Sequence, residues 1–132
     1  MVRGTTARFK FTLPYMKSEL QWVTIKFWQP GNVGTTRAPL PIIKELTHCD
    51  SPEGSTELYV SLTAEETSRF SDRLKAKVQL RARHQGGTVI GTRAKLIPVY
   101  EMDDDILNNN HEWPIEQDEW VVLDGDVIVE QR

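Results

Sequence analysis

The segment that decides the fold is Ala7-Arg8-Phe9-Lys10-Phe11-Thr12-Leu13, in which apolar and polar side chains alternate strictly. Successive side chains of a β-strand point to opposite faces, so this period of two places the four apolar residues on one face. Pro14 follows directly and ends the run, because proline has no backbone N–H to donate. The segment therefore predicts a strand with one buried face.

Further strands are predicted along the chain from the same kind of pattern. The alternating or proline-bounded segments are residues 20–28, 41–46, 58–62, 78–83 and, after Gly86-Gly87, a return strand from 89 to about 99. We expect residues 41–46 to form a short edge strand, since proline is tolerated at strand starts and edges. In residues 20–28, Trp22 and Trp28 lie on the face opposite Val23, Ile25 and Phe27.

One short helix is predicted after the segment 58–62. Thr63 and Glu66 have the spacing of a capping box, in which each side chain binds the backbone N–H of the other residue, and the helix should run to about Phe70. Six or seven strands, one short helix and no alternation of strands with helices predict an all-β protein. The expected fold is an antiparallel immunoglobulin-like β-sandwich, with a small β-barrel as the alternative.

Charge divides the chain of 132 residues into two parts. Residues 1–100 carry 15 basic and 8 acidic side chains, whereas residues 101–132 carry 1 basic and 11 acidic side chains. We expect a sandwich body over 1–100 and an acidic C-terminal arm over 101–132. The arm also holds Trp113 and several large aliphatic residues, so we expect Val121–Val129 to add a strand or hairpin to a sheet edge.

The sequence offers little material for catalysis, metal binding or membrane insertion. A lone cysteine, Cys49, excludes an internal disulfide, and the three histidines are scattered. Adjacent side chains point apart in an extended chain, so Asp103-Asp104-Asp105 is expected to be solvated or docked rather than to bind a cation. We expect no enzyme activity, no cofactor and no metal, with Cys49 as a buried structural thiol. The chain begins without an apolar signal segment and holds no apolar run of the ~20 residues that cross a bilayer.

A candidate assembly surface is predicted on the strand at 78–83 and its neighbours. The polar face of this strand forms a basic row, which the return strand of the hairpin is expected to extend, and exposed tryptophans would complete the surface. Its expected members are Lys77, Gln79, Arg81, Arg83, Arg93, Lys95, Trp22, Trp28 and Trp120. Nucleic-acid binding is disfavoured, because the whole chain has a net charge of −3 and the acidic arm can neutralise the basic row.

Five short strings lie in order along residues 3–107. They are Arg3-Gly4-Thr5-Thr6, Phe11-Thr12-Leu13-Pro14-Tyr15, Lys44-Glu45-Leu46-Thr47-His48-Cys49, Leu62-Thr63-Ala64-Glu65-Glu66-Thr67-Ser68-Arg69-Phe70 and Val78-Gln79-Leu80-Arg81. These strings resemble a family of small proteins encoded in the tail modules of siphophages and prophages of Firmicutes. The family also resembles the N-terminal β-sandwich of upper baseplate proteins. This sequence departs from the family in a longer loop at 30–41 and in the extension 108–132.

The resemblance implies a non-catalytic structural protein of a phage tail or baseplate. It would be made in the cytoplasm of the host bacterium, reside in the virion, and contact other virion proteins and copies of itself. No catalytic residues carry over from the family. Two alternatives stay open: a sandwich that binds carbohydrate or another ligand by stacking on Trp22, Trp28 or Tyr59, and a phage adaptor protein that is not part of the particle.

Overall fold

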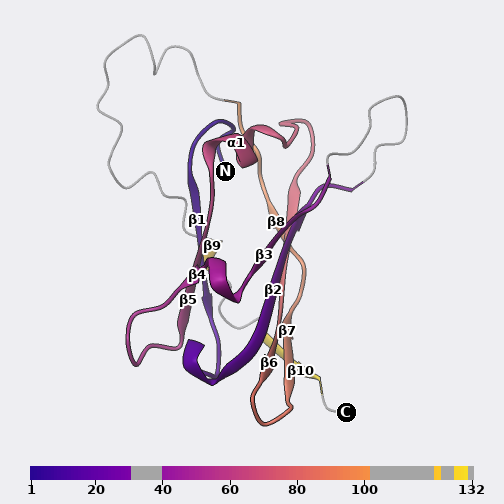
Figure 1. Cartoon of the computed structure of the whole chain (residues 1–132). Helices are drawn as coiled ribbons and strands as arrows, with labels where there is room; N and C mark the ends of the chain where they lie inside the picture. Colours follow the sequence, from indigo (N-terminus) through magenta and orange to yellow (C-terminus); the bar gives the residue numbers. More distant parts are fainter. Residues whose placement is uncertain (31–39, 102–120, 123–126, 131–132) are drawn as a thin grey trace.

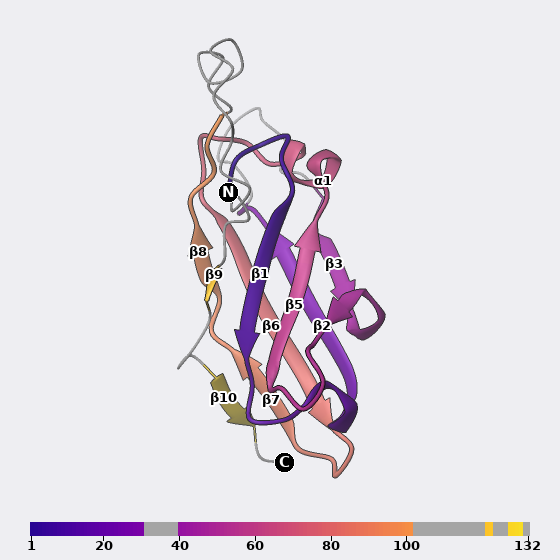
Figure 2. The same cartoon turned by 90° about the vertical axis from the view of Figure 1, so that its left-hand side faces the viewer.

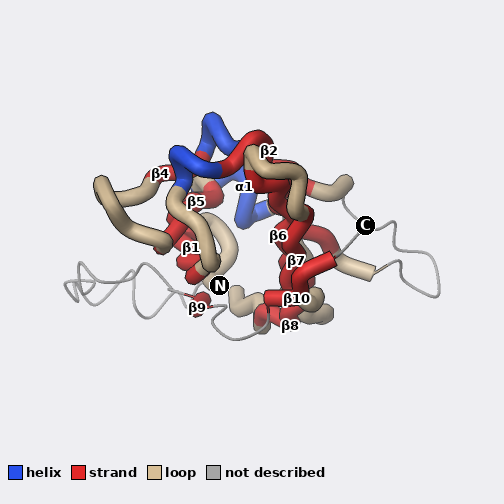
Figure 3. Tube along the Cα trace, turned by 90° about the horizontal axis from the view of Figure 1, so that it is seen from below, coloured by secondary structure: helices blue, strands red, loops and turns tan. Residues whose placement is uncertain are grey.

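Two β-sheets face each other across one hydrophobic core (Figure 1). The computed structural model of the protein describes residues 1–30, 40–101, 121–122 and 127–130. The view from below shows the two sheets as separate layers that do not close into a barrel (Figure 3). The predicted all-β sandwich with one short helix is therefore confirmed, and the barrel alternative is wrong. Most of the loop at 30–41 lies outside the described residues.

The first sheet has four strands in the order β4-β5-β1-β9. Their bounds are β1 Ala7–Thr12, β4 Cys49–Asp50, β5 Glu57–Leu62 and β9 Val121–Val122. Strand β1 pairs antiparallel with β5, so that Phe9 lies opposite Val60, and pairs in parallel with β9, so that Phe9 lies opposite Val121. Figure 2 shows β1 and β5 lying in front of the second sheet.

The second sheet follows the order β10-β7-β6-β2-β3, with β8 also paired to β6. Its strands are β2 Leu20–Trp28, β3 Ile42–Glu45, β6 Ala76–His84, β7 Val89–Thr92, β8 Lys95–Ile97 and β10 Val127–Glu130. Strand β3 lies at the edge, as predicted for its proline-bounded segment. Strands β9 and β10 add to different sheets and do not pair with each other, and the turn 124–126 lies outside the described residues.

The core is built from the apolar faces that the alternation predicted. Phe9 of β1 and Phe27 of β2 meet between the sheets with their ring centroids 4.9 Å apart, and neither side chain is exposed. Burial of each such side chain stabilises the fold by about 1.5–3 kcal/mol. The alternation therefore also determines how the sheets pack, because the apolar face of each sheet lies against the apolar face of the other.

The helix α1 (Ala64–Ser68) covers one end of the sandwich (Figure 1). The predicted capping box is present: the Glu66 N–H donates to Thr63 Oγ1 over 3.1 Å, and the Thr63 N–H donates to Glu66 Oε1 over 2.9 Å. Lys44 of β3 donates to the same carboxylate oxygen over 2.8 Å, which ties α1 to the second sheet. Two 3-10 turns that the sequence did not predict, η1 (Lys17–Glu19) and η2 (Leu46–His48), precede β2 and β4.

Two of the strings that carry the family resemblance bind each other at this end. The buried hydroxyl of Thr67 donates to the Thr5 carbonyl over 2.7 Å and accepts from the Gly4 N–H over 3.1 Å. Gly4 has a φ of +78°, a conformation that residues with a Cβ rarely adopt. Arg3 donates to the Ser68 carbonyl over 2.9 Å. The N-terminal segment is thus fastened to α1 by side-chain contacts with the backbone.

The prediction of a single return strand from 89 to about 99 is wrong, because the structure has two strands there, β7 and β8. Pairing with β6 shifts by one residue between them: Arg81 lies opposite Gly91, whereas Val78 lies opposite Lys95. Thr92 accounts for the break, since its hydroxyl accepts from the Leu80 N–H over 3.0 Å in place of a backbone partner. A one-residue shift reverses the face on which every later side chain lies.

Candidate interaction face

The surface of the second sheet that points away from the core forms the candidate site, which we call the outer face. It collects the side chains that alternate with the buried residues of β2, β3, β6 and β8. Cross-strand pairs join its members, with Trp22 opposite Arg83 and Trp28 opposite Lys77. The outer face consists of Trp22, Thr24, Lys26, Trp28, Ile43, Glu45, Lys77, Gln79, Arg81, Arg83 and Leu96.

The outer face is cationic. Four of its side chains are basic and one, Glu45, is acidic. Within the described part of the chain, no carboxylate forms an ion pair with Lys26, Lys77 or Arg83. Gln79 instead supports the sheet, because its side-chain N–H donates to the Thr92 carbonyl over 3.0 Å. The predicted basic row on β6 is therefore present as one continuous line of side chains.

Apolar groups lie among these cations. Trp22 is 36% exposed, Ile43 53% and Leu96 52%. The ammonium of Lys26 lies 4.8 Å from the ring centroid of Trp28, a cation–π contact along one strand. Exposed aromatic and aliphatic groups beside cations are typical of a surface that contacts a partner. Trp120, the third predicted tryptophan, lies outside the described residues.

Two predicted members do not belong to this face. Lys95 lies opposite Val78, whose side chain is buried in the core, so Lys95 is on the other side of the sheet from the basic row. Arg93 is exposed but lies in the break between β7 and β8. The one-residue shift at Thr92 causes both errors, because an unbroken strand would have placed both residues beside β6 on the outer face.

Five members of the outer face were not among the predicted site residues: Thr24, Lys26, Ile43, Glu45 and Leu96. Leu96 takes the place expected for Lys95, opposite Lys77. Ile43 lies opposite Lys26 through the pairing of β3 with β2. The alternation in residues 20–28 already placed Lys26 on the face with Trp22 and Trp28, so that signal was present in the sequence. Which residues lie beside Ile43 and Leu96 depends on strand order and register, and neither can be predicted from the alternation of side chains.

The outer surface of the first sheet is different, because its charges pair with one another. Lys10 lies 4.0 Å from the carboxylate of Glu57, and the Tyr59 hydroxyl donates to that carboxylate. This hydrogen bond raises the pKa of Tyr59 above its ordinary value. A tyrosine held in this way is a weaker candidate for a stacking platform than Trp22.

The residues considered for metal or thiol chemistry do not converge. Cys49 is 1% exposed, whereas its neighbours His48 and Asp50 are exposed. Burial raises the pKa of the Cys49 thiol to about 11, which keeps it protonated, and its Sγ–H donates to the Glu45 carbonyl. No group of three or more His, Cys, Asp and Glu in the described ranges is placed to hold a metal ion. Asp103-Asp104-Asp105 lies outside those ranges.

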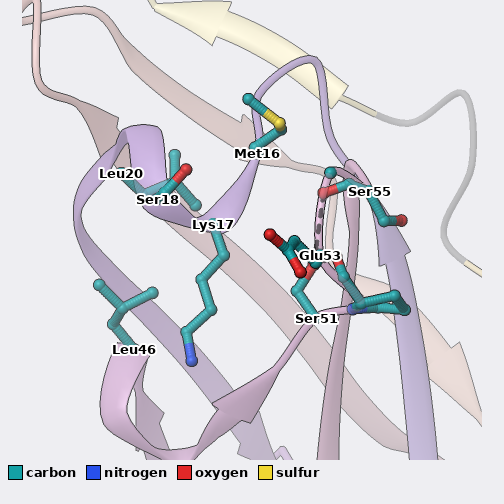
Figure 4. A pocket seen from close by; sticks show the side chains of 10 residues that line it. Met16, Lys17, Ser18, Leu20, Leu46, Ser51, Glu53 and Ser55 are labelled. Carbon is teal, nitrogen blue, oxygen red and sulfur yellow. Dashed lines mark hydrogen bonds between the residues drawn. The ribbon is translucent and has the colours of Figure 1, made fainter.

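Two surface hollows flank η2. The larger, of about 490 Å³, lies between η1 and the turn at 51–55 (Figure 4). Its polar groups serve the fold: Lys17 donates to the Cys49 carbonyl and Ser51 donates to the Glu57 carbonyl, each over 2.6 Å. The smaller hollow, of about 350 Å³, lies where β2 meets β3 and borders the outer face at Trp22.

Comparison with known proteins adds no assignment, since no protein-family model and no curated protein matches the sequence. None of the described helices has the length and apolar character needed to span a membrane.

Proposed function

We propose that the chain is a non-catalytic structural protein of a bacteriophage virion, located in the tail or baseplate region. It acts through contacts with other virion proteins and with copies of itself. The observation that carries the proposal is the outer face, which combines tryptophans, exposed aliphatic groups and cations on one rigid sheet. The resemblance of residues 3–107 to phage tail-module proteins supports the same assignment.

The composition of the outer face fits a protein–protein contact. Tryptophan and arginine are enriched among the residues that dominate binding energy at interfaces. Cations that lose water in a contact need acidic groups opposite them, and residues 101–132 carry 11 acidic side chains and one basic side chain. This charge complementarity supports contacts between copies. Repeated copies in a particle add avidity, so each contact can be weak by itself.

The strings that carry the resemblance serve the fold in this structure. Thr63 and Glu66 cap α1, Thr67 fastens the N-terminal segment, and Phe70 is buried in the core. Residues used in this way position a scaffold rather than react with a substrate. This pattern supports a structural protein over an enzyme.

The test is incorporation of charge-reversal variants into particles. We would purify particles from the phage or prophage carrying the gene, complemented with the double variant Arg81→Glu/Arg83→Glu. The matched control is Arg73→Glu/Lys75→Glu, which makes the same change of charge at two exposed residues outside the outer face. We expect the control to enter particles at the wild-type level and the outer-face variant to fall by about tenfold or more. Equal incorporation of the two variants would contradict the proposal.

A further inference from the structure

The smaller hollow brings one tryptophan together with several polar side chains. It is lined by Gln21, Trp22, Val23, Thr24, Glu45, Leu46 and Thr47. The pairing of β2 with β6 is irregular between Leu20 and Trp22, so Gln21 has no partner in the register and its side chain is exposed. Thr24 and Glu45 are paired across β2 and β3 on the same side. The floor is thus built on two paired strands and the wall on η2.

Three of the polar side chains that line this hollow are not used by the described part of the fold. Among the described residues, no hydrogen bond is formed by the side chain of Gln21, Thr24 or Thr47. In the larger hollow, by contrast, Lys17 and Ser51 are bonded to backbone carbonyls. Both hollows are open to solvent, but the smaller one alone combines an exposed indole with an amide, two hydroxyls and a carboxylate that can bind a ligand.

This set of groups selects a neutral ligand rich in hydroxyls. A pyranose ring has a flat face of C–H groups that packs on an indole, and its hydroxyls both donate and accept hydrogen bonds. The Glu45 carboxylate accepts hydrogen bonds from hydroxyls but repels phosphate, which argues against a nucleotide. A volume of about 350 Å³ lies at the small end of the range of roughly 300–1,000 Å³ for small-molecule sites.

We propose that this hollow is a carbohydrate-binding subsite in which Trp22 stacks on a pyranose ring. Gln21, Thr24, Glu45 and Thr47 bind the hydroxyls at the ring edge. The inference goes beyond assembly, since it concerns a small-molecule ligand at the margin of the outer face and does not require incorporation into a particle. One aromatic residue on an open surface gives weak binding, so we expect a Kd in the millimolar range.

The test is a titration of the ¹⁵N-labelled full chain, observed through its backbone amides and tryptophan indole N–H groups. The probes are three neutral β-linked oligosaccharides: cellotriose, N,N′,N″-triacetylchitotriose and β-1,4-galactobiose. We expect at least one of them to shift the Trp22 indole signal saturably. Trp22→Ala should weaken that binding by about tenfold or more, because it removes the stacking surface.

The matched control is Trp28→Ala, which removes a tryptophan from the same face of the same strand but outside the hollow. It should bind within about twofold of the wild type. Thr24→Val and Gln21→Ala should each weaken binding several-fold, and they keep the test valid if Trp22→Ala fails to fold. Absence of a saturable shift with all three probes, or an equal loss in Trp28→Ala, overturns the inference. Neither result bears on particle incorporation, so this inference and the proposed function fail separately.

Discussion

The structure predicts a large loss of stability when Gln29 is replaced by methionine. Gln29 follows β2 directly, is 4% exposed, and makes three hydrogen bonds to the segment between α1 and β6. Its Nε2 donates to the Ser71 carbonyl over 2.7 Å and to the Leu74 carbonyl over 2.9 Å, and its Oε1 accepts from the Ser71 N–H over 2.9 Å. Methionine has a similar length and forms none of these bonds.

The size of the loss follows from the three bonds. Each hydrogen bond contributes about 1 kcal/mol net, and a buried group left without a partner costs more, so Gln29→Met should lower the free energy of unfolding by about 3 kcal/mol. For a domain of this length, that loss corresponds to a fall in Tm of roughly 10 °C. The matched control is Gln85→Met, because the Gln85 side chain is exposed and makes one hydrogen bond, to the Ser18 carbonyl over 3.1 Å. Its loss should stay below about 1 kcal/mol.

The assay is equilibrium unfolding in urea, followed by tryptophan fluorescence, for the wild type and both variants. The three proteins should share one m-value, so that differences in midpoint report stability. A loss of stability in Gln29→Met no larger than that in Gln85→Met would show that Gln29 does not hold this segment.

Three further predictions concern the helix cap and the buried thiol. Thr63→Ala should lower the free energy of unfolding by about 1 kcal/mol through loss of the cap, and unchanged denaturant melts would show that the cap contributes nothing. Burial raises the pKa of Glu66, but the hydrogen bonds from Lys44 and Thr63 outweigh it and hold the pKa below its ordinary value of 4.5. The wild type should therefore have a higher free energy of unfolding than Glu66→Gln at neutral pH, and this difference should decline as the pH falls below 4.5. A difference that stays constant down to about pH 3 would contradict this prediction. Because burial raises the pKa of Cys49 to about 11, Ellman's reagent at about pH 8 should react slowly with the native protein and quickly in denaturant, and fast native labelling would show that the thiol is accessible.

The strands were predictable wherever alternation and turn residues agreed. Residues 20–28 form β2 with the predicted bounds, because exposed and buried side chains alternate from Trp22 to Phe27 and Pro30 follows soon after. The helix cap was predictable for a similar reason, since Thr63 and Glu66 bind backbone groups within four residues of each other. Local patterns of this kind depend on neighbours in the sequence and not on the rest of the fold.

The predictions were wrong where a side chain forms hydrogen bonds with the backbone of a distant strand or loop. Thr92 accepts the Leu80 N–H and so breaks the return strand, which moves Lys95 to the opposite side of the sheet. Gln29 reads as part of a turn signal with Pro30 and Gly31, yet its amide is buried against a segment about forty residues away. Neither threonine nor glutamine has a sequence pattern that reveals such a partner.

The most direct test of the proposed function is quantitative mass spectrometry of particles purified from the phage or prophage that carries the gene. If the chain is a virion protein, its peptides are present in a fixed ratio to the major tail protein and stay with the particles through density-gradient purification. Peptides found in the lysate but absent from purified particles would contradict a virion role and favour an adaptor protein that acts outside the particle.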